Sequence, residues 1–208
     1  MHIPTSMLCA EVMAGTGVFS FGSLCYAVMR VWTKISREKL VLFSIISLLI
    51  FILQMGDFPI LGSSGHILGG AMAGIVLGPW LGFLSMSLVI AVQAVFFNDG
   101  GILALGANIF NMAFIGAIGG WFFYIRLKDW IGTGLAGFLT AWFYAVIASL
   151  AFVIEVWISG LASFLSLFLM VQVHALVGVV EGVMTIAILK SQPVLEEVVD
   201  HVLKKENT

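Results

Sequence analysis

The stretch that decides the fold runs from Ile67 to Phe97 and reads ILGGAMAGIVLGPWLGFLSMSLVIAVQAVFF. It contains no charged residue, and a membrane-spanning helix needs about 20 consecutive apolar residues. The stretch is therefore too long for one helix, and glycine followed by proline at positions 78 and 79 is expected to interrupt it. We predict two membrane-spanning helices joined by a tight turn at Gly78-Pro79.

The composition of the whole chain agrees with a membrane environment. Hydrophobic residues make up 61% of the 208 residues and charged residues 10%, and the mean hydropathy is +1.14. A soluble domain usually has about 25% charged residues, so a soluble globule of this composition would lack polar groups for its surface. We predict a multi-pass protein of the cell membrane, surrounded by the lipid bilayer.

Apolar stretches on both sides of this segment are long enough to form further membrane-spanning helices. They are separated by a basic loop at 30–39, a polar turn at 98–101 and a charged loop at 126–130. We predict an all-α integral membrane protein with seven transmembrane helices, a single transmembrane domain at 1–190 and a cytoplasmic tail at 191–208. The further stretches are Ala10–Met29, Leu40–Met55, Ala107–Ile125, Ile131–Ile154 and Phe164–Leu189.

The distribution of basic residues favours seven helices and sets their orientation. Cytoplasmic loops of membrane proteins carry an excess of Lys and Arg. If the Gly78-Pro79 turn lies in the cytoplasm, all 9 basic residues of the chain face the cytoplasm. A single kinked helix would instead place five of those 9 on the far side. We therefore predict an N-terminus outside the cell and a C-terminus in the cytoplasm.

The charge and the motifs exclude several classes of function. The net charge is −2, so no basic field is present to hold nucleic acid. The sequence contains no glycine-rich nucleotide-binding loop and no hydrolase, zinc-protease or kinase signature. Cys9 and Cys25 are too far apart for a C-x-x-C motif, and are interpreted as packing residues. We expect a protein that is not an enzyme.

The first two residues offer a metal chelate. The α-amine of Met1, the amide nitrogen of His2 and Nδ1 of His2 can close a five-membered and a six-membered ring around one ion. These three nitrogens lie nearly in a plane, and square-planar nitrogen donation is typical of Ni(II) and Cu(II) sites. His66, in a turn on the predicted outer side, can fill the fourth corner. The alternative is a solvated terminal histidine and an unrelated loop histidine.

Six segments carry a family pattern. They read MHIP at 1–4, GHILGG at 65–70, LGPW at 77–80, QAVFF at 93–97, DGGILALGAN followed by NM at 99–112, and HALVGVVEG at 174–182. In these segments, in order and over most of its length, the chain resembles the CbiM/NikM family. Members of this family are the substrate-specificity components of cobalt and nickel energy-coupling factor transporters.

The resemblance implies a membrane protein that captures Co²⁺ or Ni²⁺ at its outer face as a transported substrate, with no organic cofactor. In the family the metal is held by the terminal amine, by the amide and imidazole of the second residue, and by a loop histidine. These positions fall on Met1, His2 and His66. The resemblance also implies ATP-driven uptake with partners: a transmembrane coupling (T) subunit, two ATPase subunits and a small accessory membrane subunit.

The chain departs from the family pattern at Thr5-Ser6, where many members have an acidic residue and a glycine. If that carboxylate orients a metal ligand from outside the coordination sphere, another group must do so here. The candidates are Asp57, Asn98, Asp99 and Asn108.

Two ionisable residues of the last apolar stretch allow a different function. His174 and Glu181 are seven positions apart and therefore share one helix face, and ionisable residues at membrane depth are functional candidates. They could serve a proton-coupled secondary metal transporter. They also belong to a segment shared with the family, which favours structural or conformational roles. An enzyme acting within the membrane is a weaker alternative, because no residues near this pair indicate a reaction.

Overall fold

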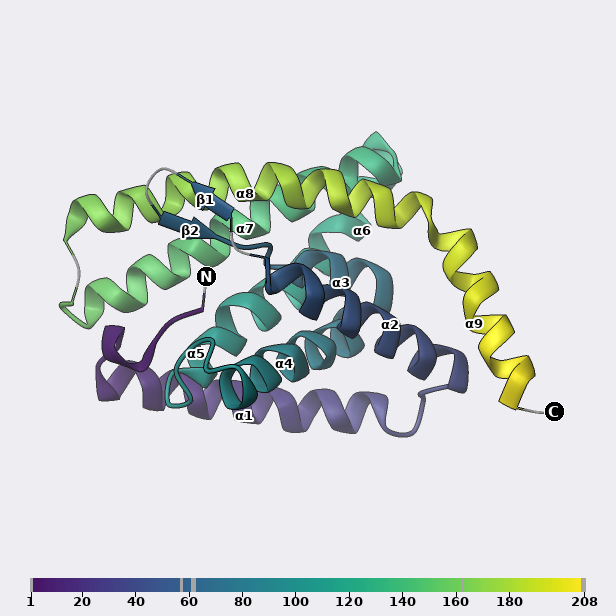
Figure 1. Cartoon of the computed structure of the whole chain (residues 1–208), viewed down its shortest axis with the longest axis horizontal. Coiled ribbons are helices and arrows are strands. Elements are labelled where there is room, and N and C mark those ends of the chain that lie inside the picture. The colour runs from purple at the N-terminus through teal and green to yellow at the C-terminus, as the bar shows by residue number, and fades with distance from the viewer. Residues whose placement is uncertain (1, 57, 61–62, 162, 207–208) are drawn as a thin grey trace.

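The helices of this computed structural model form a bundle with one short hairpin at its side (Figure 1). The structure describes residues 2–56, 58–60, 63–161 and 163–206. The elements are η1 (Thr5–Met7), α1 (Ala10–Val31), α2 (Arg37–Gln54), β1 (Phe58–Ile60), β2 (Ser63–Gly65), α3 (Gly70–Leu77), α4 (Pro79–Phe96), α5 (Leu105–Asn108), η2 (Ile109–Gly119), α6 (Gly120–Ile131), α7 (Thr133–Ile158), α8 (Phe164–Lys190) and α9 (Gln192–Glu206).

The predicted all-helical membrane class is confirmed. Among the described residues, five helical segments are long and apolar enough to cross a membrane. Helix α2 is not among them, because its first turn carries three charged residues. The count of seven spans and the orientation remain predictions. The five segments are Ala10–Val31, Pro79–Phe96, Leu105–Ile131 (α5, η2 and α6 as one continuous helix), Thr133–Ile158 and Phe168–Lys190.

The break at Gly78-Pro79 is present, but the helix before it is short. Gly78 has φ +82, and Pro79 is the first residue of α4, a position that suits proline because its missing N–H has no intrahelical partner there. Helix α3 has 8 residues and is therefore about 12 Å long, whereas the hydrocarbon core of a bilayer is about 30 Å thick. The expectation of two full-length spanning helices in 67–97 is wrong for α3.

Residues 126–130, expected to form a charged loop, are the last turns of α6. The chain turns instead at Gly132, which has φ +81. Arg126 lies over the Phe122 ring and donates a 2.7 Å hydrogen bond to the Phe122 carbonyl. The apolar stem of a long charged side chain can cover a helix surface while its head stays polar, so these charges do not end the helix.

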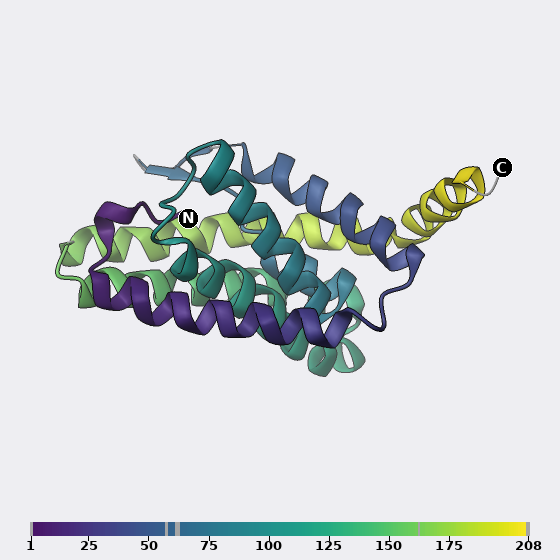
Figure 2. The ribbon, with the colours of Figure 1, turned by 90° about the horizontal axis from the view of Figure 1, so that it is seen from below.

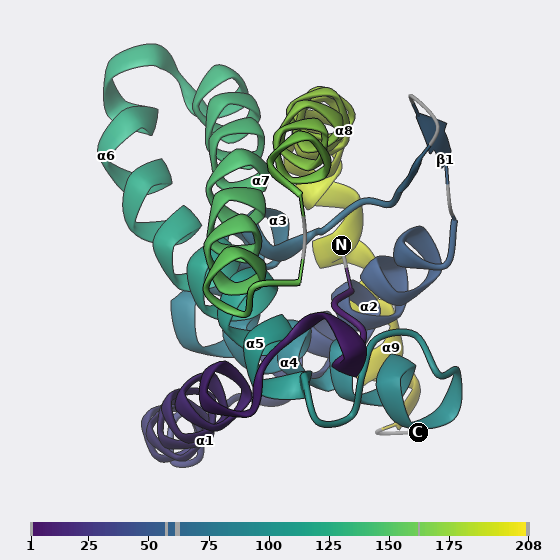
Figure 3. The ribbon, with the colours of Figure 1, turned by 90° about the vertical axis from the view of Figure 1, so that its left-hand side faces the viewer.

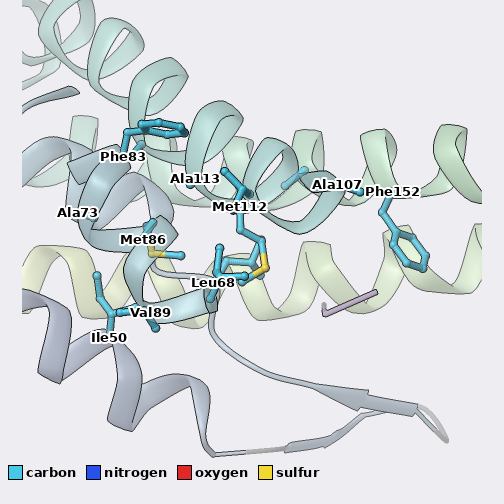
Figure 4. Close-up of a cluster of buried hydrophobic side chains, with 14 of the residues drawn as sticks. Ile50, Leu68, Ala73, Phe83, Met86, Val89, Ala107, Met112, Ala113 and Phe152 are labelled. Carbon is cyan, nitrogen blue, oxygen red and sulfur yellow. The ribbon is translucent and has the colours of Figure 1, made fainter. Parts of the chain in front are cut away.

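Helix α3 packs so closely on η2 that their backbones touch. A Cβ placed on Gly70 would overlap the Met112 carbonyl, and one on Gly74 would overlap the backbone of Ala117. Small residues allow such close approach of helices in a membrane. The buried side chains around this contact form the core, with Leu68 and Met112 among them (Figure 4).

The N-terminal segment and the last helix lie at opposite ends of the bundle (Figure 1). Helices α7 and α8 run side by side, and α9 leaves the bundle at the opposite end from the N-terminus (Figures 1 and 2). Seen from the N-terminal end, the segment before α1 runs inward between α8 and the α2–α4 side of the bundle (Figure 3). The side chain of His2, at the start of this segment, is accordingly 3% exposed.

Candidate metal site at the N-terminus

The structure brings together the two histidines that were predicted as ligands. The imidazole rings of His2 and His66 stack with their centroids 4.7 Å apart and their planes at 12°. The His2 side chain is 3% exposed and His66 is 6% exposed. Met1 and Asp57, also named as candidates, lie outside the described residues. The fold thus brings two histidines that are distant in sequence together in its interior.

The backbone of the N-terminal segment is held by Asn108. The amide N–H of Ile3 donates to Oδ1 of Asn108 at 2.7 Å, and Nδ2 of Asn108 donates to the Ile3 carbonyl at 3.2 Å. The same carbonyl accepts a bond from the N–H of Gly101 at 2.9 Å. Ile3 is fully buried. Asn108 therefore fixes the backbone of the segment beside His2, and its role in supporting a metal ligand stays a prediction.

The glycines that follow Asp99 allow this segment to lie against their loop. Gly100 has φ +86, and a Cβ there would come within 3.2 Å of the His2 Cβ. A Cβ on Gly101 would overlap the backbone of Thr5. The loop at 98–101 and the segment at 2–5 therefore touch along their backbones, and larger residues would push them apart.

Asp99 supplies a negative charge at His2. Its Oδ2 lies 3.0 Å from Nδ1 of His2, although neither ring nitrogen of His2 has a well-aligned hydrogen bond to any described residue. The polar contact with His2 lowers the pKa of Asp99, against the opposing effect of partial burial. The carboxylate is thus ionised next to the predicted ligand atom, where a negative charge would be favourable beside a divalent cation. Asn98, the residue before Asp99, has a left-handed backbone conformation with φ +53.

The hydrogen bonding of His66 sets its tautomer. Nδ1 of His66 lies 3.0 Å from the carbonyl of Ile67. A carbonyl only accepts, so Nδ1 carries the proton and the lone pair of the neutral ring is on Nε2. Burial is the main effect that lowers the pKa of His66, which keeps the ring neutral. Neutral imidazole with its second nitrogen hydrogen-bonded to a carbonyl is a common arrangement for a metal ligand.

The loop that follows His66 is fixed by two helices. The N–H of Leu68 donates to Oε1 of Glu181 at 2.5 Å, and the N–H of Gly69 also bonds to this carboxylate. The carbonyl of Leu68 accepts a 2.6 Å bond from Nε2 of Gln54. Glu181 on α8 and Gln54 on α2 therefore position the chain between His66 and α3. Gln54 was missed in the sequence because a glutamine at the end of an apolar stretch carries no distinctive pattern.

His174 is buried near His66 but is not bonded to Glu181. It is fully buried, its Nδ1 lies 2.9 Å from the Met170 carbonyl, and it interacts electrostatically with His66. Its Nε2 has no hydrogen-bond partner among the described residues. Glu181 thus holds a loop, whereas His174 is a separate buried imidazole on the same helix, and the predicted roles of the two residues stay untested.

A second buried polar pair lies between η2 and α7. Nδ2 of Asn111 donates to Oε2 of Glu155 at 2.7 Å. The serine hydroxyl of Ser159 accepts a 2.9 Å bond from the N–H of Cys9 and donates to the carbonyl of Glu155. The start of α1 is therefore joined to the end of α7. Spacing in the sequence did not indicate that Asn111 and Glu155 pair.

The side chains alone do not make a complete metal site. Within the described part of the chain, no group of three or more His, Cys, Asp and Glu is close enough to hold a metal ion. The predicted site needs only two side chains, because its other two donors are the terminal amine and the His2 amide nitrogen. The arrangement can therefore supply a nitrogen-rich site only if the backbone takes part.

Comparison with known proteins places this chain in a family. Residues 2–192 match the family model of CbiM, described as "Cobalt uptake substrate-specific transmembrane region". The chain is 37% identical over 194 residues to a putative fused nickel transport protein of Archaeoglobus fulgidus, with 91% of this chain and 64% of that protein covered. It therefore spans about two thirds of that relative's length.

Two further relatives support the match. A putative metal transport protein of Haloquadratum walsbyi is 34% identical over 192 residues, which cover 89% of this chain and 86% of that protein. The crystal structure of a truncated transition metal transporter superposes with a TM-score of 0.81 at 29% identity, over 92% of this chain and 97% of the other. The likeness therefore extends over nearly the whole chain in both sequence and fold.

Proposed function

Since the chain belongs to the CbiM family, a family of multi-pass membrane components of cobalt and nickel transport, we propose that it is the substrate-binding subunit of an ATP-driven uptake transporter for Co²⁺ or Ni²⁺. In this proposal it captures the metal at the outer face of the cell membrane. The proposed ligands are the α-amine of Met1, the amide nitrogen and Nδ1 of His2, and Nε2 of His66.

The observation that carries the proposal is the stacking of His2 on His66 in the interior. His2 lies next to a chain end, where residues normally keep conformational freedom, and it has lost that freedom because its side chain is 3% exposed. The bonds of Asn108 and Gly101 to Ile3 offset that loss of freedom. A fold that confines its first residues in this way supplies the preorganisation that a backbone chelate requires.

The donor set favours late first-row divalent ions. Three nitrogens in consecutive chelate rings, with an imidazole at the fourth corner, suit the square-planar geometry of Ni(II) and are acceptable to Co(II). Metal binding requires loss of protons from the ligands. The contribution of Asp99 is charge compensation close to Nδ1 of His2. Thr5, which stands where many members have an acidic residue, lies against Gly101 with both its backbone and its hydroxyl.

The energy for uptake is proposed to come from partner subunits. This chain contains no nucleotide-binding loop, and a binding subunit cannot accumulate its substrate without an energy source. We infer a complex with a transmembrane coupling subunit, two ATPase subunits and a small accessory membrane subunit. ATP hydrolysis belongs to these partners.

The competing function is a proton-coupled secondary transporter that uses His174 and Glu181. The bonds of Glu181 to the backbone of Leu68 and Gly69 favour a positioning role, because a proton carrier at this place would have to release the loop that holds His66. Liposomes that contain this chain alone distinguish the two functions. Accumulation of metal driven by a proton gradient would support the secondary transporter and contradict the proposed function.

The direct test of the metal site uses the extreme N-terminus. We expect the purified protein, exposed to a mixture of Co, Ni, Cu and Zn salts, to retain one ion in stoichiometric amount by elemental analysis. One extra residue before Met1, or acetylation of its amine, removes a chelating donor. The affinity for the metal should then fall by more than the factor of about 10–100 that is typical when a metal ligand loses an outer hydrogen-bond partner. His2→Ala and His66→Ala should behave alike, and His201→Ala on α9 serves as the control. Unchanged affinity of the extended protein would overturn the amine ligand.

A further inference from the structure

A basic pocket lies at the end of the bundle opposite to the two histidines. It has a volume of about 250 Å³ and is lined by Arg30, Lys34 and Lys39 together with the turn at Gly78-Pro79. Arg30 lies in the last turn of α1, Lys34 in the turn between α1 and α2, and Lys39 in the first turn of α2. This turn is at the far end of α1 from the N-terminus (Figure 2).

The cations of this pocket differ in their surroundings, because Lys39 also borders a second pocket that is lined by Glu38, Glu196 and Asp200. None of them makes an ion pair with any residue that the structure describes, and all three are exposed. The start of α4, with Pro79 as its first residue and no side-chain cap, forms another wall. The first amide groups of a helix have no intrahelical acceptor and add a positive partial charge there. The pocket is therefore suited to an anion.

An apolar groove continues directly from the basic pocket. The groove has a volume of about 380 Å³, and all of its lining residues are apolar, with Val28, Trp32 and Phe43 among them. Val31, Ile35 and Leu81 line both the groove and the basic pocket, so the two are continuous. The groove follows the end of α1, a helix that is long and apolar enough to lie across a membrane.

Aromatic side chains mark the level of this pocket. The rings of Tyr26 and Trp80 meet edge to face with their centroids 4.8 Å apart, and the guanidinium of Arg30 lies 5.9 Å from the centre of the Tyr26 ring. Tyrosine and tryptophan are enriched where the hydrocarbon core meets the headgroups. The basic pocket is therefore at headgroup level, and the apolar groove adjoins it.

We propose that this pocket and groove bind one anionic phospholipid, with its phosphate among Arg30, Lys34 and Lys39 and an acyl chain in the groove. An anionic headgroup joined to an apolar chain matches a basic pocket that continues into an apolar groove. Basic pockets between transmembrane helices are known to hold such headgroups. Zwitterionic lipids lack the net negative charge that three unpaired cations require. The site does not share residues with the proposed metal site, so it goes beyond the proposed function.

Native mass spectrometry of the protein in detergent, titrated with phosphatidylglycerol or with phosphatidylcholine of the same acyl chains, tests the proposal. We expect one phosphatidylglycerol to bind at least about tenfold more tightly than phosphatidylcholine. Each basic residue near a headgroup contributes about fivefold, so Arg30→Gln/Lys34→Gln/Lys39→Gln should weaken this binding by about 100-fold. The matched control Arg126→Gln/Lys128→Gln/Lys190→Gln removes the same charge elsewhere and should have little effect. Equal losses in the two triple variants would overturn the proposal.

The groove is tested separately. Val28 lines the groove and is 43% exposed, and Val18 on the same helix is 76% exposed outside it. We expect Val28→Trp to fill the groove and weaken phosphatidylglycerol binding at least about fivefold, and Val18→Trp to leave it unchanged.

Two further results would overturn the lipid assignment. Complete displacement of the lipid by millimolar glycerol phosphate would show a site for soluble phosphate alone. Normal lipid binding by the Arg30/Lys34/Lys39 triple variant, together with loss of a co-purifying coupling subunit, would show a protein contact instead. Metal binding by both triple variants should stay normal, which separates this test from that of the proposed function.

Discussion

Asn108→Ala tests whether the docked N-terminal segment creates the metal site. The change removes two hydrogen bonds, from the Ile3 N–H at 2.7 Å and to the Ile3 carbonyl at 3.2 Å. The carbonyl keeps its bond from Gly101, whereas the buried N–H of Ile3 loses its acceptor, at a cost of about 1–3 kcal/mol. A lost outer partner of a metal ligand typically lowers affinity about 10–100-fold, and about 1.4 kcal/mol corresponds to tenfold. We expect Ni²⁺ or Co²⁺ binding to weaken by about this factor.

The assay is competition for the metal with a chelator of known affinity, combined with amide hydrogen exchange of residues 2–8. Asn108→Asp separates the two bonds, because a carboxylate can accept from Ile3 but cannot donate to it. We expect this variant to retain most of the affinity. Ser47→Ala is the control: it breaks the buried 2.7 Å bond between Ser47 and Ser85, which should lower stability and leave metal affinity intact. The reasoning is refuted if Asn108→Ala exposes Ile3 to exchange yet binds metal as tightly as the unaltered protein.

Three further predictions concern the loop, the bundle and the topology. Glu181→Gln should weaken metal binding about tenfold, because hydrogen bonds to a charged group contribute about 1.5–3 kcal/mol; unchanged chelator competition would contradict the positioning role. Gly74→Ala should lower the Tm, because its Cβ would overlap the backbone of η2, and overpacking costs about 1–3 kcal/mol. Gly134→Ala, where a Cβ meets nothing within 4 Å, should not lower it. A reporter fused after Lys128 should indicate the cytoplasm and one inserted near Gly100 the outside; a cytoplasmic signal at Gly100 would refute seven spans.

The local features of the bundle could be predicted from the sequence, because they depend on composition and on neighbouring residues. Apolar length predicted the helices, and the Gly78-Pro79 pair predicted the break between α3 and α4. The sequence could not show that α3 begins only at Gly70. That boundary depends on Glu181 and Gln54, which hold the backbone of Leu68 from two other helices.

The site shows the same division between local and distant effects. The possible chelate of Met1 and His2 could be predicted because it needs only two adjacent residues. The resemblance to the family indicated His66 as the further ligand. Spacing in the sequence could not show that Asn108 binds the backbone of Ile3, or that Asp99 approaches a ring nitrogen of His2. Four residues were equal candidates in the sequence, and only their positions in space distinguish these two.

The sequence by itself determined that this protein lies in a membrane and where most of its helices run, and it predicted that its first residues offer a metal chelate. These properties follow from composition and from groups joined by a few covalent bonds. Only the tertiary structure decided that His2 lies on His66 and that Ile3 is bonded to a residue 105 positions away. The physical reason is that such contacts depend on how whole helices pack, and close packing of α3 on η2 is set by all of their facing residues together.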